Sequence, residues 1–369
     1  MPKADRLQWL RRLPDHERVE LANLPTPIQR LPRLSAKLGG PEIWMKRDDL
    51  TGLPGGGNKT RKLEFLIADA LRQGADILLT IGAIQSNHTR QTAAAAAKVG
   101  IECALLHCHW APDGGPHYRQ VGNVLMSALV GAQLYLDDTA RPVGDETSLG
   151  LLAEQLRTEG RTPYLIPCGA SDHPLGGLGY AAAAGEILSQ SDDMGLTFDA
   201  IVHCTGSSST QAGLLAGLAA ADSRIRVIGV ADDGERLEKL DRVSRLARDT
   251  LTGLGVKTLV SNPQVEVIVT DTADYGVASE RTVDAIRLLA ETEGIVTDPV
   301  YEGKAVRGLI NLIDAGDLRK GQRVLLMHLG GVPAVDAYAE NLWRVEMKPF
   351  QVPLKDREGS LQAASRYQA

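Results

Sequence analysis

Short apolar segments alternate with longer segments of helical periodicity from about Glu42 onward. This alternation is typical of repeated βα units, in which helices connect the strands of a parallel sheet. We expect strands over Ile43–Lys46, Ile77–Ile81, Ile101–His107, Gln133–Leu136, Tyr164–Ile166, Ala200–His203, Val227–Val230, Val265–Val269 and Val324–His328. Helices should follow nearly all of these strands, and the clearest are Lys59–Gln73, Asn87–Val99, Gln211–Ala221, Glu280–Glu293 and Gly303–Ala315.

The length of this series indicates how many domains the chain forms. A single hydrophobic core stops growing at about this size, so a chain of 369 residues built from βα units divides most naturally into two open sheets. The expected fold class is therefore α/β with two open parallel-sheet domains. The last residues, 346–369, are polar and are expected to form a surface-draped or partly disordered tail.

Charge and composition narrow the choice of partners. The formal net charge is −6 and the basic residues are scattered, which predicts neither a nucleic-acid nor a membrane partner. The N-terminal stretch is too charged for a signal peptide, and no window is apolar for long enough to span a bilayer. We therefore expect a cytoplasmic protein that acts on a small molecule.

The cysteines carry no metal or disulfide signature. Cys103, Cys108, Cys168 and Cys204 form no CxxC pair, and each lies in or beside an apolar segment. Buried, reduced thiols are the expectation for such cysteines in a cytosolic protein, with no metal site.

A first candidate for chemistry is the glycine-rich stretch from Gly52 to Lys62, at a junction between a strand and a helix. Glycines allow a ligand to approach the backbone closely, and the start of a helix offers unpaired amide donors. A nucleotide-binding P-loop requires its lysine directly after the last glycine, whereas Asn58 separates Gly57 from Lys59. A ligand site, a P-loop and a plain glycine-rich turn with solvated lysines all stay open here.

A second stretch, from Gly82 to Arg90, follows an apolar strand and begins an alanine-rich helix. Either Ser86 or Asn87 would serve as the N-cap, which leaves the other polar side chain free to face a ligand crevice. His88, taken alone, is expected at the surface.

A third stretch places Ser207, Ser208, Ser209 and Thr210 between a strand and a helix that begins near Gln211. One hydroxyl residue would suffice as a cap. Consecutive hydroxyl residues behind a glycine instead indicate a phosphate site at the positive end of the helix dipole.

A fourth stretch, Thr297 to Lys304, contains Tyr301 and Glu302, and Tyr275 lies upstream. The tyrosine and the carboxylate could serve only as a cap. Together with the other three stretches they become candidates for acid–base chemistry and for tuning a cofactor.

These four stretches, in this order and at these separations, resemble the family of 1-aminocyclopropane-1-carboxylate deaminase and D-cysteine desulfhydrase. The similarity runs from about Leu24 to Tyr338 through GGNKTRKLEF, IQSNHTRQ, GGLGY, STQAG and TDPVYEGK. The family belongs to the tryptophan-synthase-β-like pyridoxal-phosphate enzymes. The resemblance implies pyridoxal 5′-phosphate in a cleft between a smaller domain, 61–169, and a larger cofactor-binding domain, 1–60 with 170–345. A homodimer is expected by family analogy alone.

The resemblance also implies roles for individual residues. Lys59 would carry the cofactor, and Asn87 would hydrogen-bond the hydroxyl of its ring. Lys62 and the residues from Ser207 to Thr210 would hold its phosphate. Ser86, Tyr275 and Tyr301 would be the hydroxyl groups around a small amino-acid substrate. This set matches what the chemistry requires, because the cofactor needs a lysine, a phosphate site and groups that move protons.

Two positions separate the branches of the family. Deaminases carry glutamate after the tyrosine of DPVY and leucine after the histidine of HxGG, whereas desulfhydrases carry small hydroxyl residues at both. This chain has Glu302 and Leu329. A carboxylate beside the pyridine nitrogen keeps it protonated and makes the ring a stronger electron sink. Aminocyclopropane carboxylate has no hydrogen on its α-carbon, so its ring opening depends on that sink.

Other positions depart from the deaminase pattern and keep alternatives open. His88 stands where family deaminases usually carry glutamine, and residues 45–55 are more similar to desulfhydrase and cysteate sulfo-lyase relatives. A D-cysteine desulfhydrase or a related β-eliminating lyase is therefore the main alternative to the deaminase. A P-loop phosphotransferase is the alternative of another class. A non-catalytic binding module ranks last, because the lysine and both tyrosines are present.

Overall fold

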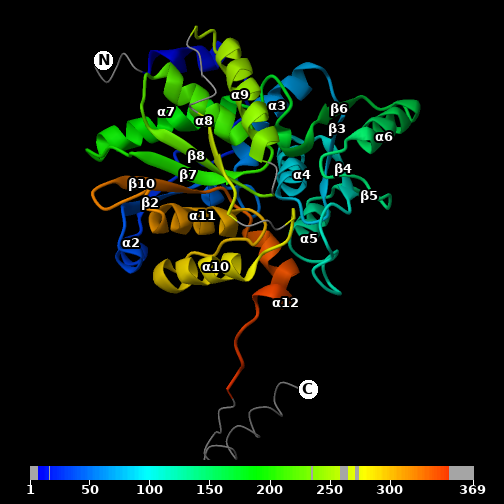
Figure 1. The fold of residues 1–369 in the computed structure, drawn as a ribbon. Coiled ribbons are helices and arrows are strands. Elements are labelled where there is room, and N and C mark those ends of the chain that lie inside the picture. The colour runs from blue at the N-terminus through cyan, green and yellow to red at the C-terminus, as the bar shows by residue number, and fades with distance from the viewer. Residues whose placement is uncertain (1–6, 16, 234–235, 258–264, 271–273, 349–369) are drawn as a thin grey trace, which may run out of the picture.

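The computed structural model describes residues 7–15, 17–233, 236–257, 265–270 and 274–348. Its strands form two separate sheets, as the sequence predicts (Figure 1). In the described part of the chain, no helix combines the length and the apolar character that crossing a membrane requires.

The larger sheet has six strands in the order β1-β2-β10-β7-β8-β9. These strands are β1 (Ile28–Arg30), β2 (Glu42–Arg47), β7 (Ala200–Thr205), β8 (Arg226–Ala231), β9 (Glu266–Ile268) and β10 (Arg323–His328). All neighbours pair in parallel except β1, which runs antiparallel to β2 at the edge of the sheet.

The smaller sheet has four parallel strands in the order β5-β4-β3-β6. They are β3 (Ile77–Ala83), β4 (Glu102–Cys108), β5 (Gln133–Asp137) and β6 (Pro163–Ile166). All four lie within the range predicted for the smaller domain, and the strands of the larger sheet lie outside it. The exact domain boundaries remain a prediction.

Helices cover both faces of the larger sheet (Figure 1). One face packs against α7 (Leu178–Asp193), α8 (Ser209–Ala220) and α9 (Arg236–Gly253). The opposite face packs against α2 (Pro32–Leu38), α10 (Glu280–Glu293) and α11 (Glu302–Asp314). Side chains of β10 alternate between these two cores, Leu325 on the first and Leu326 on the second, as the pleat of a doubly covered strand requires.

The smaller sheet is covered in the same manner. Helices α3 (Lys59–Arg72) and α4 (Asn87–Val99) pack on one face, and α6 (Thr147–Thr158) packs on the other. Helix α5 (Gly122–Leu129) lies beside α4, and α12 (Ala339–Leu342) ends the described helices. Short 3₁₀ segments occur at Gln8–Asp15, Asp48–Leu50, Cys168–Ala170 and Val332–Tyr338. Helix α3 also contacts α7, so it connects the two sheets.

The predicted elements are present, with differences at their ends. Each predicted strand is found with ends that differ by no more than two residues. Helix α8 begins at Ser209 rather than near Gln211, so Ser209 and Thr210 belong to the helix and not to the loop. Strand β1 was not predicted. Of the predicted tail, residues 346–348 are exposed without regular structure, and residues 349–369 lie outside the described residues.

Candidate active site

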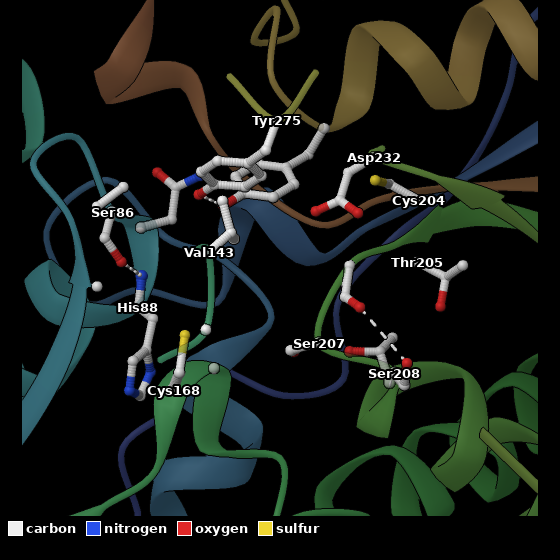
Figure 2. A pocket seen from close by; sticks show the side chains of 18 of the residues that line it. Ser86, His88, Val143, Cys168, Cys204, Thr205, Ser207, Ser208, Asp232 and Tyr275 are labelled. Carbon is white, nitrogen blue, oxygen red and sulfur yellow. Dashed lines mark hydrogen bonds between the residues drawn. The ribbon is translucent and has the colours of Figure 1, made fainter. Parts of the chain in front are cut away.

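A cavity of about 230 Å³ lies at the carboxyl ends of strands from both sheets (Figure 2). Open α/β sheets bind their ligands at this edge. Among the predicted site residues, those that line it are Lys59, Ser86, Asn87, His88, Ser207, Ser208, Thr210, Tyr275, Tyr301, Glu302 and Leu329. Helices α3, α4, α8 and α11 all begin at the cavity, and the positive ends of their dipoles favour an anionic ligand there.

The glycine-rich stretch brings Lys59 to the cavity as the first residue of α3. Gly56 has a φ of +56°, and a Cβ there would lie 1.7 Å from the Asp49 carbonyl oxygen, so only glycine fits. The Lys59 Nζ donates a hydrogen bond to Asn58 Oδ1 at 3.1 Å. Burial lowers the pKa of the Lys59 amine, and nearby acidic groups, led by Cys168, oppose that shift. The neutral, nucleophilic form of the amine is thereby favoured.

The second stretch divides its two polar side chains between capping and the cavity. Ser86 is the N-cap of α4, and its Oγ accepts from the N–H groups of His88 and Thr89 at 3.2 and 3.3 Å. Asn87 Oδ1 accepts a hydrogen bond from Asn123 Nδ2 at 3.0 Å. Because that oxygen is occupied, the Nδ2 donor of Asn87 is the group left for a ligand oxygen.

The expectation that His88 lies at the surface is wrong. The residue is 4% exposed, because α4 is packed between α3 and α5. Its Nε2 lies 2.8 Å from Thr80 Oγ1, and that hydroxyl donates to the Ile166 carbonyl oxygen at 2.7 Å. With its only proton used there, Thr80 must accept from His88 Nε2. Burial, Lys59 and Lys62 hold the pKa of His88 well below its usual range, so the imidazole is neutral.

The third stretch, residues 205–210, runs from the last residue of β7 to the first turn of α8, and we call it the serine loop. Ser208 has a φ of +72°, a left-handed conformation that costs a residue other than glycine about 1–2 kcal/mol. Thr205 is 1% exposed, and its Oγ1 has no hydrogen-bond partner among the described residues. A strained backbone and an unpartnered buried hydroxyl at the start of α8 are features of a site built for a ligand.

Lys62 and Ser209 lie behind the cavity wall instead of lining it. The Lys62 Nζ donates to Ser209 Oγ at 2.7 Å and to the Gly169 carbonyl oxygen at 3.3 Å. Burial and the neighbouring Lys59 hold the pKa of Lys62 well below its usual range. Contact of Lys62 or Ser209 with a cofactor phosphate therefore remains a prediction.

Tyr275 and Tyr301 join their hydroxyl groups at the cavity through a hydrogen bond. Their rings meet edge to face at 5.9 Å, with an interplanar angle of 62°. Burial raises the pKa of both phenols well above their usual range, so both are neutral at physiological pH. A pair of this kind can donate a proton to a substrate and pass another between its own members.

Glu302 begins α11 and is 3% exposed in the cavity wall. Burial raises its pKa well above the usual range, and the adjacent Asp298 adds to the shift. The Leu329 N–H donates to the Glu302 carboxylate, and this hydrogen bond opposes the rise in the Glu302 pKa. Asp298 caps the helix, because its carboxylate accepts from the N–H groups of Tyr301 and Glu302 at 2.8 and 3.1 Å.

Leu329 lies at the cavity on a closely packed segment of backbone. The following residue, Gly330, has a φ of +111°, and a Cβ on it would lie 2.7 Å from the Cα of Gly57. The Leu329 carbonyl oxygen accepts from the Asn58 N–H at 2.8 Å. The segment after β10 is therefore packed directly against the segment that precedes Lys59.

Sequence reasoning missed several residues of the cavity. Asp232 directly follows β8, and its Oδ1 lies 2.8 Å from Lys239 Nζ of α9. The rule that ligands bind at the carboxyl ends of parallel strands could have found Asp232. Trp110 and Cys168 line the cavity from the side of the smaller sheet, and Cys168, predicted to be buried like the other three cysteines, is partly exposed there. All four cysteines are free.

Comparison with known proteins places this site in a family. Residues 19–330 match the model of the pyridoxal-phosphate dependent enzyme family. The chain belongs to this family, and the match assigns the glycine-rich stretch to a pyridoxal-phosphate enzyme rather than to a nucleotide-binding P-loop.

Curated relatives within the family carry one name. Proteins called 1-aminocyclopropane-1-carboxylate deaminase from Burkholderia vietnamiensis and Methylobacterium nodulans are each 45% identical to this chain. The first alignment covers 86% of this chain and 94% of the relative, and the second covers 87% and 96%. A solved structure of an ACC deaminase homologue has a TM-score of 0.82 at 38% identity, covering 93% of this chain and 98% of the other. O-ureido-L-serine synthase, at a TM-score of 0.61 and 20% identity, covering 86% of this chain and 92% of its own, shares the fold.

The residues present fit the cofactor. The start of α8 and the unpartnered Thr205 hydroxyl suit a phosphate dianion, and the desolvated Lys59 amine suits covalent attachment. The buried carboxyl of Glu302 suits the nitrogen of a pyridine ring. A protonated ring nitrogen there would be a positively charged partner for the Glu302 carboxylate.

Proposed function

We propose that this protein is a 1-aminocyclopropane-1-carboxylate deaminase that converts its substrate and water into 2-oxobutanoate and ammonia. The observation that carries the proposal is the meeting of Glu302 and Leu329 in one cavity with Lys59 and the tyrosine pair. The two residues of the deaminase pattern lie more than 240 positions after Lys59 in the sequence and yet line the same cavity. The names of the relatives at 45% identity support the same conclusion.

Holding the cofactor is the first task of the site. Lys59 would carry it, the serine loop would hold its phosphate, Asn87 would donate to its ring hydroxyl and Glu302 would hold its ring nitrogen. When bound, pyridoxal phosphate supplies an electron sink for the charge released when a bond at the substrate α-carbon breaks.

The remaining groups would act on the substrate. The positive end of the α4 dipole would face the substrate carboxylate. The Ser86 hydroxyl would donate a hydrogen bond to it. The neutral Tyr275–Tyr301 pair would exchange protons with the ring carbons of the substrate as the ring opens. The Lys59 amine, free when the substrate has replaced it, would serve as a second proton carrier.

A D-cysteine desulfhydrase or a related β-eliminating lyase remains the second candidate. His88 favours it, because a neutral imidazole stands two residues from Ser86 where deaminases carry an amide. Elimination of sulfide demands less electron withdrawal by the cofactor than ring opening does, so the same lysine and tyrosines would suffice for it.

The remaining features of the proposal concern the setting of the enzyme. A cytoplasmic location is supported by the four free cysteines, since reduced thiols are typical of that compartment. A homodimer, with no nucleic-acid partner, is proposed by family analogy and can be measured by light scattering.

Two measurements test the proposal. Borohydride reduction of the purified enzyme followed by peptide mapping should place the cofactor on Lys59, and a label on Lys62 or Lys304 would refute that role. A product assay should detect 2-oxobutanoate from aminocyclopropane carboxylate in excess of pyruvate and sulfide from D-cysteine, L-cysteine or cysteate. Sulfide without 2-oxobutanoate would establish the lyase instead.

A further inference from the structure

Asn58 makes three hydrogen bonds that join separate parts of the cavity wall. Its side-chain Oδ1 accepts from Lys59 Nζ at 3.1 Å, and its Nδ2 donates to Thr210 Oγ1 at 3.1 Å. Its backbone N–H donates to the Leu329 carbonyl oxygen at 2.8 Å. The residue is 8% exposed and therefore connects the lysine, the serine loop and the segment after β10 within the protein interior.

The direction of this side chain departs from the local preference of asparagine. Asn58 is the N-cap of α3, where an asparagine side chain ordinarily accepts a hydrogen bond from an N–H of the first helical turn. Here it makes no such bond. Gln91, on α4, takes over part of the task, because its Oε1 accepts from the Thr60 N–H at 3.0 Å. The backbone of Asn58 is already helical, at φ −64° and ψ −25°, so its side chain is not placed to cap the helix and is available to Lys59 and Thr210.

We propose that Asn58 is a positioning residue for Lys59: its side-chain oxygen holds the lysine amine, and its side-chain nitrogen anchors that contact to the serine loop. When the Lys59 amine is not bonded to the cofactor, Asn58 Oδ1 is its hydrogen-bond partner. The Asn58 side chain is held in turn by the hydrogen bond from its Nδ2 to Thr210 Oγ1.

The choice of an amide instead of a carboxylate has a chemical reason. A lysine that attacks the cofactor or takes up a proton from the substrate must present a neutral amine with a free electron pair. An amide oxygen accepts one N–H and leaves that electron pair available. A carboxylate at the same 3.1 Å would stabilise the charged ammonium and remove the electron pair.

This inference rests on the proposed role of Lys59, and its test is read at the lysine itself. The full-length protein is freed of cofactor and exposed to trace acetic anhydride over a range of pH. Peptide mass spectrometry then gives the pKa of Lys59, with Lys98 in the same sample as the internal reference. Asn58→Asp and Asn58→Ala are compared with the parent. Thr210→Val is the matched control, because it removes the anchor but keeps the Oδ1 acceptor.

The expected order of the Lys59 pKa is Asn58→Asp highest, the parent intermediate and Asn58→Ala lowest. A new carboxylate at this distance should raise the pKa by about 1 to 3. Thr210→Val should change it less than either Asn58 variant. In the reconstituted enzyme, Asn58→Asp should move the acidic limb of the kcat profile to higher pH, because the lysine then stays protonated over more of the range.

The proposal is overturned if both Asn58 variants leave the pKa of Lys59 at the parent value, whatever they do to the thermal unfolding temperature. That result would assign Asn58 to packing alone. Borohydride mapping of the parent keeps the two proposals distinguishable. A cofactor found on another lysine would refute the proposed function, whereas the influence of Asn58 on the Lys59 amine is measured without the cofactor.

Discussion

The guanidinium of Arg61 donates two hydrogen bonds to the carboxylate of Asp48, from Nε to Oδ2 and from Nη2 to Oδ1, both at 2.8 Å. Both side chains are almost completely buried. Arg61 lies two residues after Lys59 on α3, and Asp48 follows β2, so the pair fixes the start of α3 against the larger sheet. The charge of Arg61 lowers the pKa of Asp48 to about 2 even though burial raises it.

Arg61→Met should lower the free energy of unfolding by about 3–5 kcal/mol, because it leaves the Asp48 carboxylate buried without its cation. Urea denaturation measures the change. Arg226→Met is the control. It breaks ion pairs with Glu266 and Asp317, whose side chains are 33% and 44% exposed, and exposed pairs contribute about 0–1 kcal/mol each. Equal losses in the two variants would show that burial adds nothing to the Arg61 pair.

Glu302→Gln should change how the stability of the cofactor-free protein depends on pH. Burial raises the pKa of Glu302 in the folded state above its unfolded value, so its contribution to stability is full below about pH 4.3 and is lost as the pH rises toward the folded pKa. The glutamine variant has no such loss. Its stability relative to the parent should increase above about pH 4.3, by up to about 1.4 kcal/mol per pH unit. Glu17→Gln, which removes a carboxylate at an exposed position, is the control. A constant difference for Glu302→Gln would contradict the burial argument.

Ser208 offers a test of the phosphate site that separates backbone shape from side-chain chemistry. Ser208→Val should weaken cofactor retention far more than it weakens folding, because a β-branched residue resists the φ of +72° and the loop amides must shift. Ser208→Gly keeps that φ without strain and should retain the cofactor within a few-fold of the parent. Cofactor affinity follows from absorbance titration of the cofactor-free protein. Full retention in Ser208→Val would count against a phosphate at this loop.

Substrate choice should respond to Glu302 and Leu329 together. Glu302→Ser removes the carboxylate that we propose as the partner of the ring nitrogen, so ring opening should slow more than β-elimination from D-cysteine. Leu329→Thr adds a neutral hydroxyl at the same wall. Since about 1.4 kcal/mol of transition-state stabilisation is worth tenfold in rate, the double variant should shift the ratio of the two activities by roughly one to two orders of magnitude. If the ratio is unchanged, Glu302 and Leu329 do not determine the substrate, and His88 or residues 48–55 become the candidates for that role.

The fold could be predicted from the sequence where a strong local period exists. Central strands such as β3 and β7 are buried on two faces and stand out as apolar segments, and α4 and α10 have the bounds that the periodicity predicts. Strand β1 has only three residues, too few for a period of two to be visible. The order of the strands in each sheet depends on pairing between distant segments, which no local pattern contains.

The site was less predictable, for reasons that individual residues make clear. Lys62 and Ser209 have the chemistry of phosphate ligands, yet the first turns of α3 and α8 direct these two side chains toward each other. His88 has an ordinary polar sequence context, and only the packing of three helices buries it. Asp232 was passed over because a lone aspartate after a strand resembles any turn residue.

The contact between Gly57 and Gly330 bears on how such an enzyme can change its substrate over evolutionary time. A Cβ on Gly330 would lie 2.7 Å from the Gly57 Cα, so Gly330 cannot acquire a side chain without separating the lysine segment from the opposite wall. The Leu329 side chain itself is under no such constraint, since only the backbone beside it is in close contact. A substitution at Leu329 can therefore change the cavity wall while the glycine contact keeps the lysine segment in place.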